Sequence, residues 1–362
     1  MGFNEAVSYE QLRVAMMECS RNVKWKGSVC EFLLSAPFRL TKLQQELIND
    51  TYTISRYQKF TITEPKRREI VSTRLRDRIW QRSMCNNGLY DDLTRSLIYD
   101  NCACLVGRGI SFAFNRIKTH MQQHFRQYGN TGYVLKIDIS KFFASIPHIG
   151  AKLTVAKRVH DVKFLKHVYA IIDSFEDPRD RTEILKDKYF ERGLGLGSQI
   201  SQLIALAYLD DVDHLMKEVY HVRHYIRYMD DIVIIVPTKE QANHILHIMK
   251  HELNKLGLIV NKKTNISEFC NGIRFLKRRY FVTPTGRVIA LYNRKSLSRE
   301  RRKLKKLISL VDQNKIEMDA IFEHYACWKN YAMQTSSRAC ILKMDRFLNN
   351  LLQQRGYKIK CK

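Results

Sequence analysis

The feature that most restricts the fold of this chain is the stretch 225–236, Tyr-Ile-Arg-Tyr-Met-Asp-Asp-Ile-Val-Ile-Ile-Val. Apolar, β-branched and aromatic residues flank two adjacent carboxylates, which predicts a strand, a tight turn and a second strand. Buried carboxylates without a partner are costly, so Asp230 and Asp231 must meet solvent, a cationic partner or a metal ion. Viewed alone, the hairpin fits an exposed Asp-Asp turn as well as it fits a metal site.

A second strand upstream favours the metal site. Residues 133–139, Tyr-Val-Leu-Lys-Ile-Asp-Ile, place another carboxylate, Asp138, at the end of an apolar run. If both strands belong to one antiparallel sheet, their carboxylates meet at its edge, where they could hold two divalent cations for in-line phosphoryl transfer. These residues therefore predict a polymerase.

The charge of the chain indicates the class of its partner. Its 362 residues contain 62 Lys and Arg against 36 Asp and Glu, which gives a net charge of +26. Such an excess predicts attraction to a polyanion, and nucleic acid is the commonest one. An anionic membrane is the alternative, but no apolar run approaches the length of a spanning helix and no secretory signal opens the chain. We therefore expect no membrane partner.

Nine cysteines are scattered along the chain without a Cys-x-x-Cys pair or a Cys/His quartet. This spacing argues against structural zinc, and an odd number of irregularly spaced cysteines is typical of reduced thiols. We therefore expect a cytoplasmic protein, with room for two or three structural units.

A basic hairpin is predicted over residues 57–71, where two β-rich runs flank Glu-Pro-Lys-Arg-Arg at 64–68. Lys66 and Arg68 would lie at its tip and could grip phosphates, although a solvated basic turn explains them equally well. Arg74 is the first of three arginines spaced by two, of which at most one or two can face a ligand.

A glycine-rich run occupies residues 193–202, Gly-Leu-Gly-Leu-Gly-Ser-Gln-Ile-Ser-Gln. Three glycines spaced by two allow the backbone to approach a ligand closely. The run is neither a Walker loop nor a dinucleotide fingerprint, because it lacks Gly-Lys-Ser/Thr and no βαβ pattern follows. A helix is expected to begin after it.

The last quarter of the chain carries most of the excess charge. Residues 271–362 contain 22 Lys and Arg against 6 Asp and Glu, and residues 299–306 alone contain six cations. A charge run is usually a solvated face. Here the size of the excess favours a helical surface that follows a phosphate backbone.

Taken in order, these stretches resemble a reverse transcriptase across nearly the whole chain. The similar segments are the first palm motif at 135–143 (Leu-Lys-Ile-Asp-Ile-Ser-Lys-Phe-Phe), the motif after it at 197–202, the metal turn Tyr228-Met229-Asp230-Asp231, the lysine motif Lys262-Lys263-Thr264 and the primer-grip hairpin at 273–276 (Ile-Arg-Phe-Leu). That hairpin usually continues with Gly, and Lys277 stands there instead.

Among reverse transcriptases, the chain resembles those of diversity-generating retroelements. Most families carry Gln-Gly before the Ser of the second motif and Pro after it, whereas residues 196–202 read Leu-Gly-x-x-x-Ser-Gln, the form of that group. Residues 99–104, Tyr-Asp-Asn-Cys-Ala-Cys, and 107–109, Gly-Arg-Gly, resemble its fingers segment. The resemblance implies an enzyme that copies a template RNA into cDNA with frequent errors at adenines, helped by a small basic accessory protein.

The resemblance also implies an α+β, right-hand polymerase fold. Its parts would be an N-terminal helical segment at 1–50, α-rich fingers at 51–130, an antiparallel-sheet palm at 131–290 with a helical insertion at about 150–192, and a basic helical thumb at 291–362. In the palm, Asp138 and Asp230 would bind two Mg²⁺ ions, with Asp231 adjacent and the Ile139 carbonyl as a further ligand. Mn²⁺ would be a substitute.

Residues that bind the deoxynucleoside triphosphate follow from the same resemblance. Lys66, Arg68 and Arg74 would grip phosphates from the fingers, and Lys263 would neutralise or protonate the leaving pyrophosphate. Phe143, five residues after Asp138, matches the family's sugar-discriminating position. The second motif would contribute Leu196, Gly197, Ser201 and Gln202.

Two alternatives stay open. A reverse transcriptase of an antiviral-defence system or an intron-derived maturase would carry the same motifs, and an adenine-biased template repeat beside the gene would favour the retroelement. A non-catalytic RNA-binding protein on a decayed polymerase fold is the other alternative. The intact carboxylates argue against it, and a primer-extension assay would decide.

Overall fold

The computed structural model of this chain describes residues 2–63, 68–176, 179, 181–195, 197–292 and 294–357, and for residues 68, 69, 181, 294 and 295 it describes the backbone only. The chain falls into two units. The first comprises Met1–Ala113, Lys136–Ile232 and His244–Asn265, and the second comprises Phe114–Leu135, Val233–Asn243 and Ile266–Lys362.

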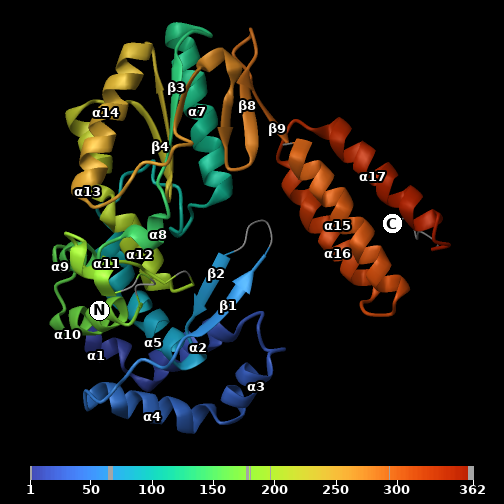
Figure 1. The fold of residues 1–362 in the computed structure, drawn as a ribbon. Helices are drawn as coiled ribbons and strands as arrows, with labels where there is room; N and C mark the ends of the chain where they lie inside the picture. Colours follow the sequence, from blue (N-terminus) through green and yellow to red (C-terminus); the bar gives the residue numbers. More distant parts are fainter. Residues whose placement is uncertain are drawn as a thin grey trace. The chain divides into compact units, whose positions relative to one another are not determined.

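Helices form the first fifty residues, where apolar side chains recur every three to four positions. They are α1 (Phe3–Ala6), α2 (Tyr9–Ser20), α3 (Gly27–Leu34) and α4 (Ala36–Ile48) (Figure 1). The Ser8 hydroxyl caps α2 by accepting a hydrogen bond from the Gln11 N–H. The N-terminal segment is therefore helical, as predicted.

The predicted basic hairpin is present. Strands β1 (Gln58–Ile62) and β2 (Arg68–Ser72) pair antiparallel, with Gln58 opposite Ser72 and Ile62 opposite Arg68. Its tip, including Lys66, lies outside the described residues. The chain continues through α5 (Leu75–Met84), a π-helical turn η1 (Cys85–Leu89) and α6 (Tyr90–Thr94).

The central part of the chain alternates helices with the strands of the main sheet. Strands β3 (Tyr133–Asp138), β4 (His224–Tyr228), β5 (Asp231–Val236) and β6 (Asn265–Glu268) form a four-stranded sheet in the order β4-β5-β3-β6. The intervening helices are α7 (Ile110–Tyr128), α8 (Phe142–Ser145), α9 (His148–Ala156), α10 (Val162–Asp173), α11 (Arg181–Lys186), α12 (Gln199–Tyr208), α13 (Asp210–His214), the π-turn η2 (Leu215–Val219) and α14 (Lys239–Lys255).

The second unit contains a three-stranded antiparallel sheet preceded by the 3-10 turn η3 (Phe269–Asn271). Its order is β7 (Ile273–Phe275), β8 (Arg278–Val282), β9 (Val288–Tyr292). The Arg278 guanidinium is buried between two rings of this unit, 3.4 Å from the centroid of Phe114 and 4.4 Å from that of Tyr331.

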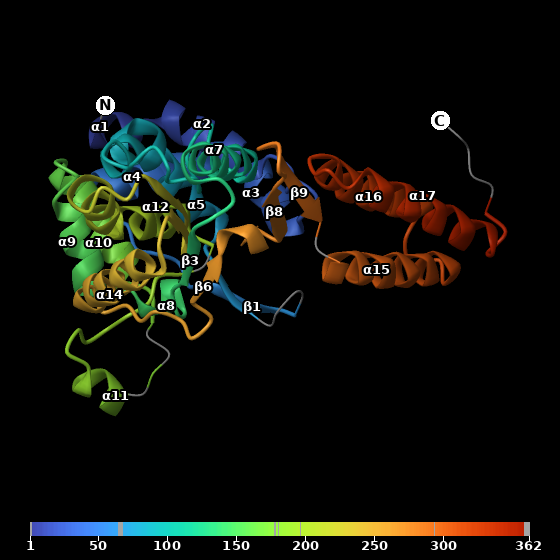
Figure 2. The ribbon, with the colours of Figure 1, turned by 90° about the horizontal axis from the view of Figure 1, so that it is seen from above.

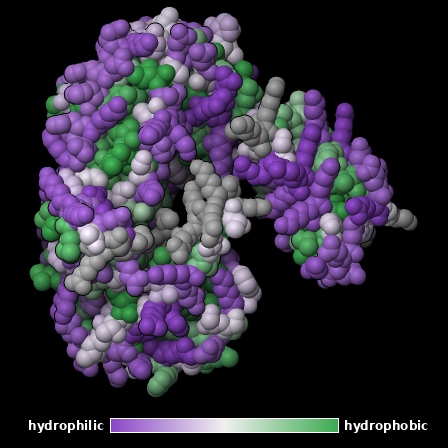
Figure 3. Space-filling model, in the orientation of Figure 1, coloured by the Kyte–Doolittle hydropathy of each residue, from purple (hydrophilic) through white to green (hydrophobic). Residues whose placement is uncertain are grey.

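The C-terminal helices α15 (Arg294–Asp312), α16 (Met318–Met333) and α17 (Arg338–Gln353) pack side by side (Figures 1 and 2). Leu304, Trp328 and Met344, one from each helix, belong to their shared core. The six cations of residues 299–306 are exposed, and hydrophilic residues cover most of the visible face of these helices (Figure 3). None of the helices in the described ranges is long and apolar enough to cross a membrane.

Candidate active site

The turn between β4 and β5 carries the two adjacent carboxylates, as the sequence predicts. β4 ends at Tyr228 and β5 begins at Asp231. Met229 adopts the left-handed conformation with φ of 56°, which is unfavourable for a side chain with a Cβ atom. Tyr228 and Met229 pack against a buried apolar cluster of Leu97, Ala103 and Leu206, which supports the turn.

The backbone of Asp138, which carries the third carboxylate, is held by the segment that contains the lysine motif. Its N–H donates to the Thr264 hydroxyl at 3.3 Å, and its carbonyl accepts from the Asn261 N–H at 2.7 Å. The next residue, Ile139, forms an antiparallel bridge with Val260. The first palm motif and the lysine motif, which are more than a hundred residues apart, are therefore adjacent in space.

Electrostatics link the three carboxylates. Burial raises the pKa of Asp231 to about 6, and the charges of Asp230 and Asp138 act in the same direction. Lys136 opposes this effect, because its Nζ lies 3.2 Å from the Asp231 carboxylate. The structure thus brings all three predicted carboxylates into one electrostatic neighbourhood.

Two observations bear on whether these carboxylates fit a divalent metal ion. Among the described residues, no three His, Cys, Asp or Glu side chains lie close enough together to hold a metal ion. Oδ1 of Asp231 is buried and makes no hydrogen bond, and the Lys136 Nζ lies 3.2 Å from it as an ion-pair partner. Half-buried carboxylate oxygens are the ligands that a hard cation such as Mg²⁺ prefers, so the chemistry of these residues fits the ion.

The two phenylalanines after Asp138 differ in exposure. Phe142 is 3% exposed and belongs to the core, whereas Phe143 is half-buried and meets it edge to face at 5.6 Å between ring centroids. The Phe143 carbonyl accepts a hydrogen bond from the Leu194 N–H at 2.8 Å, which joins this segment to the glycine-rich run. Of the two rings, Phe143 is the one that retains a free surface.

Close contacts within the protein explain why glycine stands at two positions of the glycine-rich run. A Cβ on Gly195 would lie 2.1 Å from the Phe175 ring, and one on Gly197 would lie 3.0 Å from the Val71 carbonyl of β2. Gly197 also has φ of 121°, which glycine tolerates best. The run thus packs closely against Phe175, just after α10, and against strand β2 of the basic hairpin.

The second-motif residues differ in accessibility. Gly197 is exposed and Gln202 is half-buried. Ser201 is fully buried, and its N–H donates to the Ser198 hydroxyl that caps α12. Leu196 lies outside the described residues.

The basic residues that are predicted to contact phosphates also differ in accessibility. Lys66 and the Arg68 side chain lie outside the described residues, whereas Arg74 is exposed and donates from Nε to the Arg56 carbonyl at 3.3 Å. Lys263 is exposed beside the Asp138 strand. Arg76 binds Glu46 and Asp77, and Arg78 donates to the Cys19 carbonyl. Both are half-buried, so Arg74 is the most exposed of the three arginines.

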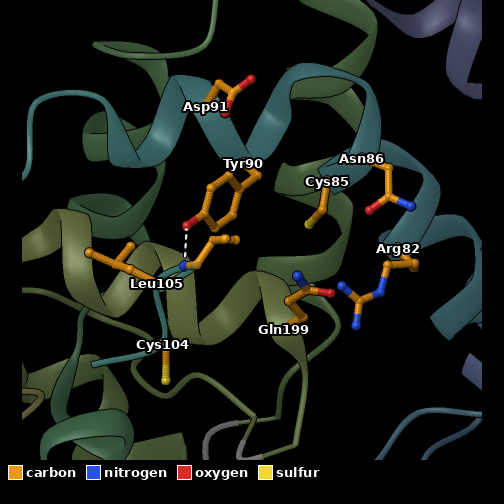
Figure 4. A pocket seen from close by; sticks show the side chains of 9 residues that line it. Arg82, Cys85, Asn86, Tyr90, Asp91, Cys104, Leu105 and Gln199 are labelled. Carbon is orange, nitrogen blue, oxygen red and sulfur yellow. Dashed lines mark hydrogen bonds between the residues drawn. The ribbon is translucent and has the colours of Figure 1, made fainter. Parts of the chain in front are cut away.

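A cavity of about 400 Å³ lies at the N-terminal end of α12. Its wall includes Arg82, Asn86, Tyr90 and Gln199, and Figure 4 shows the Arg82 and Gln199 side chains directed toward one another. Because α12 rises about 1.5 Å per residue, this cavity is roughly 10 Å along the helix from Leu206, which supports the carboxylate turn.

A buried ion pair behind the turn was not predicted. Arg227 and Asp213 are both fully buried, and Arg227 directly precedes Tyr228. The signal in the sequence is a single cation inside the apolar run Tyr-Ile-Arg-Tyr, since a buried cation requires an acidic partner. Asp213 is fourteen residues earlier, so no local spacing identifies it.

Comparison with known proteins identifies the family of the chain. Residues 85–278, more than half of the chain, match the family described as "Reverse transcriptase (RNA-dependent DNA polymerase)". No curated protein matches the sequence.

Solved telomerase structures are similar to the chain. A telomerase from Candida albicans, in complex with a TWJ fragment of telomeric RNA, has a TM-score of 0.53 and 10% identity over 84% of this chain and 54% of that chain. An apo telomerase from Candida tropicalis has a TM-score of 0.49 and 14% identity over 86% of this chain and 65% of that chain. The chain thus spans less than two thirds of either telomerase. The first likeness, together with the family match, confirms the α+β right-hand polymerase fold.

Proposed function

Because the chain belongs to the reverse transcriptase family of RNA-directed DNA polymerases, we propose that it synthesises cDNA on a template RNA from deoxynucleoside triphosphates. The observation that carries this proposal is that Asp138, Asp230 and Asp231 interact: burial raises the pKa of the Asp231 carboxyl, and the charges of Asp230 and Asp138 add to this effect. Buried carboxylates that repel one another weaken a fold, so a cluster of them indicates a site for cations.

Two Mg²⁺ ions suit these ligands, and Mn²⁺ would substitute for them. Asp138, Asp230, Asp231 and the Ile139 carbonyl would hold them. When bound, the ions would lower the pKa of the primer 3′-hydroxyl and offset the charge of the triphosphate. Lys136 supplies a positive charge at Asp231, and this limits the mutual repulsion of the carboxylates.

The other predicted residues would orient the nucleotide. Phe143 presents a ring surface next to the Asp138 strand and would exclude a ribose 2′-hydroxyl. Exposed Arg74 and Lys263, with Lys66 and Arg68, would contact phosphates. Leu196, Gly197, Ser201 and Gln202 would form the wall near the nascent base pair, with Ser201 acting through the cap of α12.

The division into fingers at 51–130, palm at 131–290 and thumb at 291–362, after the N-terminal segment 1–50, is part of this proposal. The exposed cations of α15 would follow the template–primer backbone. Within the family, we assign the chain to the diversity-generating group, which works with a small basic accessory protein in the cytoplasm. The Leu-Gly-x-x-x-Ser-Gln form of residues 196–202 supports this assignment.

Primer extension by the purified chain tests the activity. With Mg²⁺, an RNA template and a DNA primer, the wild-type chain should extend the primer. A chain that binds the template–primer but never extends it would instead be an RNA-binding protein.

Sequencing of cDNA made on RNA that copurifies with the chain tests the subgroup. Errors concentrated opposite template adenines would support the retroelement assignment. Uniformly low error rates would favour a defence enzyme or a maturase.

A further inference from the structure

A buried charge network lies directly behind the carboxylate turn. The Arg227 guanidinium donates to both oxygens of Asp213, from Nε at 2.8 Å and from Nη2 at 2.5 Å. The Tyr225 hydroxyl donates to the same carboxylate at 2.6 Å. Tyr225 and Arg227 are two residues apart on β4, so both side chains point to the same face of the strand. Asp213 therefore anchors two side chains of the strand that leads into the turn.

The guanidinium of Arg227 also donates to two backbone carbonyls, one in α12 and one in the turn itself. Nη2 donates to the Leu206 carbonyl in the last turn of α12 at 2.9 Å, where helix carbonyls lack partners within the helix. Nη1 donates to the Met229 carbonyl, at 3.4 Å. One guanidinium thus connects α12, α13 and the turn residue that precedes Asp230.

The backbone of Arg227 is fixed as well. Its N–H donates to the Asp100 carbonyl at 3.1 Å, and its carbonyl accepts from the Cys102 N–H at 2.9 Å. Met229, two residues later, has a left-handed conformation that is unfavourable for a residue with a side chain. Such a conformation persists only where the surroundings hold it, and Arg227 is the side chain that contacts its carbonyl.

We propose that Arg227 is a positioning residue for the polymerase reaction. Its guanidinium, anchored by Asp213, to which the Tyr225 hydroxyl also donates, holds the Met229 carbonyl and thereby fixes where Asp230 and Asp231 present their carboxylates to metal ions. This inference rests on the proposed function, in which those carboxylates bind the ions. The planar guanidinium suits this role because it donates to three acceptors at once: the Asp213 carboxylate and the Leu206 and Met229 carbonyls. A lysine ammonium does not direct its hydrogen bonds in this fixed planar arrangement.

Stability alone gives no reason for this network. A buried ion pair is often replaceable by apolar side chains without loss of stability, whereas a fixed geometry requires directional hydrogen bonds. The pair also lies where a small displacement would be transmitted to the turn, because only Tyr228 and Met229 separate Arg227 from Asp230.

The same short helix offers a matched control. Asp210 of α13 forms a second ion pair with Arg158, which follows α9, at 3.1 Å. The two side chains are 2% and 11% exposed, and Arg158 also lies 3.5 Å from Asp211. The other hydrogen bond of the Arg158 guanidinium goes to the Thr154 carbonyl, not to the turn. Arg158→Lys therefore perturbs a buried ion pair of the same kind without touching Met229.

The test compares Arg227→Lys with Arg158→Lys in the full chain. We measure kcat and KM for a deoxynucleoside triphosphate, the Mg²⁺ midpoint of activity, Mn²⁺ affinity by electron paramagnetic resonance, RNA affinity and Tm. For Arg227→Lys we expect kcat to fall about tenfold or more, with weaker binding of both metal ions and little change in KM or RNA affinity. Arg158→Lys should lower Tm to a similar extent and leave kcat and the metal midpoints nearly unchanged.

Several results would overturn the proposal. Wild-type kcat and metal affinity in Arg227→Lys, or equal losses in both variants, would reduce the network to a structural ion pair. If Arg227→Lys fails to fold, Tyr225→Phe removes one hydroxyl from Asp213, and it should lower Mn²⁺ affinity and kcat by several-fold. Unchanged values in that variant would also refute the proposal. A wild-type chain that extends no primer would refute the proposed function, whereas Mn²⁺ affinity would still report whether Arg227 positions the carboxylates.

Discussion

The carboxylate turn and the basic helix α15 use charge in opposite ways. At the turn, each described charge lies close to another one: Lys136 contacts Asp231, and Arg227 is fully buried against Asp213. On α15, six cations within eight residues are all exposed. Buried charges are held by their neighbours and so define a geometry, whereas exposed cations attract any polyanion and are screened by salt. Under the proposed function, the chain therefore positions its reacting groups with buried charges and attracts its substrate with exposed ones.

The largest effect is expected at the turn. Asp230→Asn keeps the size of the side chain but removes a metal-binding charge, so primer extension should fall by about a thousandfold or more. RNA affinity should stay within about twofold of wild type, because binding depends on the exposed cations. Extension assays and filter binding on the same preparation check both expectations. Extension at a wild-type rate would contradict the assignment of Asp230 as a metal ligand.

Substitutions on α15 should have the opposite effect: nucleic-acid affinity should fall while the rate of extension stays the same. Replacing Arg301, Arg302 and Lys305 by Gln should weaken RNA–DNA affinity roughly tenfold or more at moderate salt, and the slope of log affinity against log salt should fall by about one for each lost phosphate contact. The rate constant of a bound complex should stay the same. As a control, exchanging Arg for Lys and Lys for Arg at the same three positions should keep both the affinity and the salt slope near those of the wild type. A salt slope that does not change would place the nucleic acid elsewhere.

Shape should determine sugar choice independently of charge. Phe143 is half-buried and has no charge to be screened, so Phe143→Ala should raise ribonucleotide incorporation about tenfold, equally at low and high salt. Phe142→Ala is the matched control, because its ring is in the core and its loss should lower stability instead. Incorporation of ribonucleotides by Phe142→Ala and not by Phe143→Ala would move the assignment by one residue.

The sequence indicates the candidate carboxylates but not the side chains that hold them in place. Asp138, Asp230 and Asp231 stand out because they interrupt apolar runs, and in the structure the charges of Asp138 and Asp230 act on the buried Asp231 carboxyl. Asp213 does not stand out, because its partner is fourteen residues away and the pairing depends on how α13 packs against β4. The glycine-rich run shows the same limit. Its composition indicates close approach, and only the fold identifies the Phe175 ring and the Val71 carbonyl as what Gly195 and Gly197 approach.

The smallest effect on activity at neutral pH is expected from a buried group that stays uncharged. His167 stacks on Phe3 with 5.6 Å between ring centroids and meets Trp80 edge to face at 5.1 Å. Burial lowers the pKa of His167 to about 4, and this effect outweighs the nearby charge of Asp50, which raises it. An unfolded histidine has a pKa of about 6.5. Between these two values the unfolded chain binds more protons, so the free energy of unfolding decreases as pH falls from 6.5 to 4.

This loss of folding stability at low pH should come from the buried, neutral His167 and not from the exposed charges of α15. We expect His167 to account for about 1–3 kcal/mol of lost stability by pH 4, measured by urea unfolding across the window. His167→Phe keeps a ring in the stack but cannot bind a proton, so it should flatten the decrease. His247→Gln, at an exposed position of α14, should leave it unchanged. Because both ends of the Phe3–His167 contact lie in the first unit, this loss should also appear as weaker protection of α1 and α10 in hydrogen exchange. An identical pH profile in wild type and His167→Phe would show that other groups, not this buried imidazole, cause the acid sensitivity.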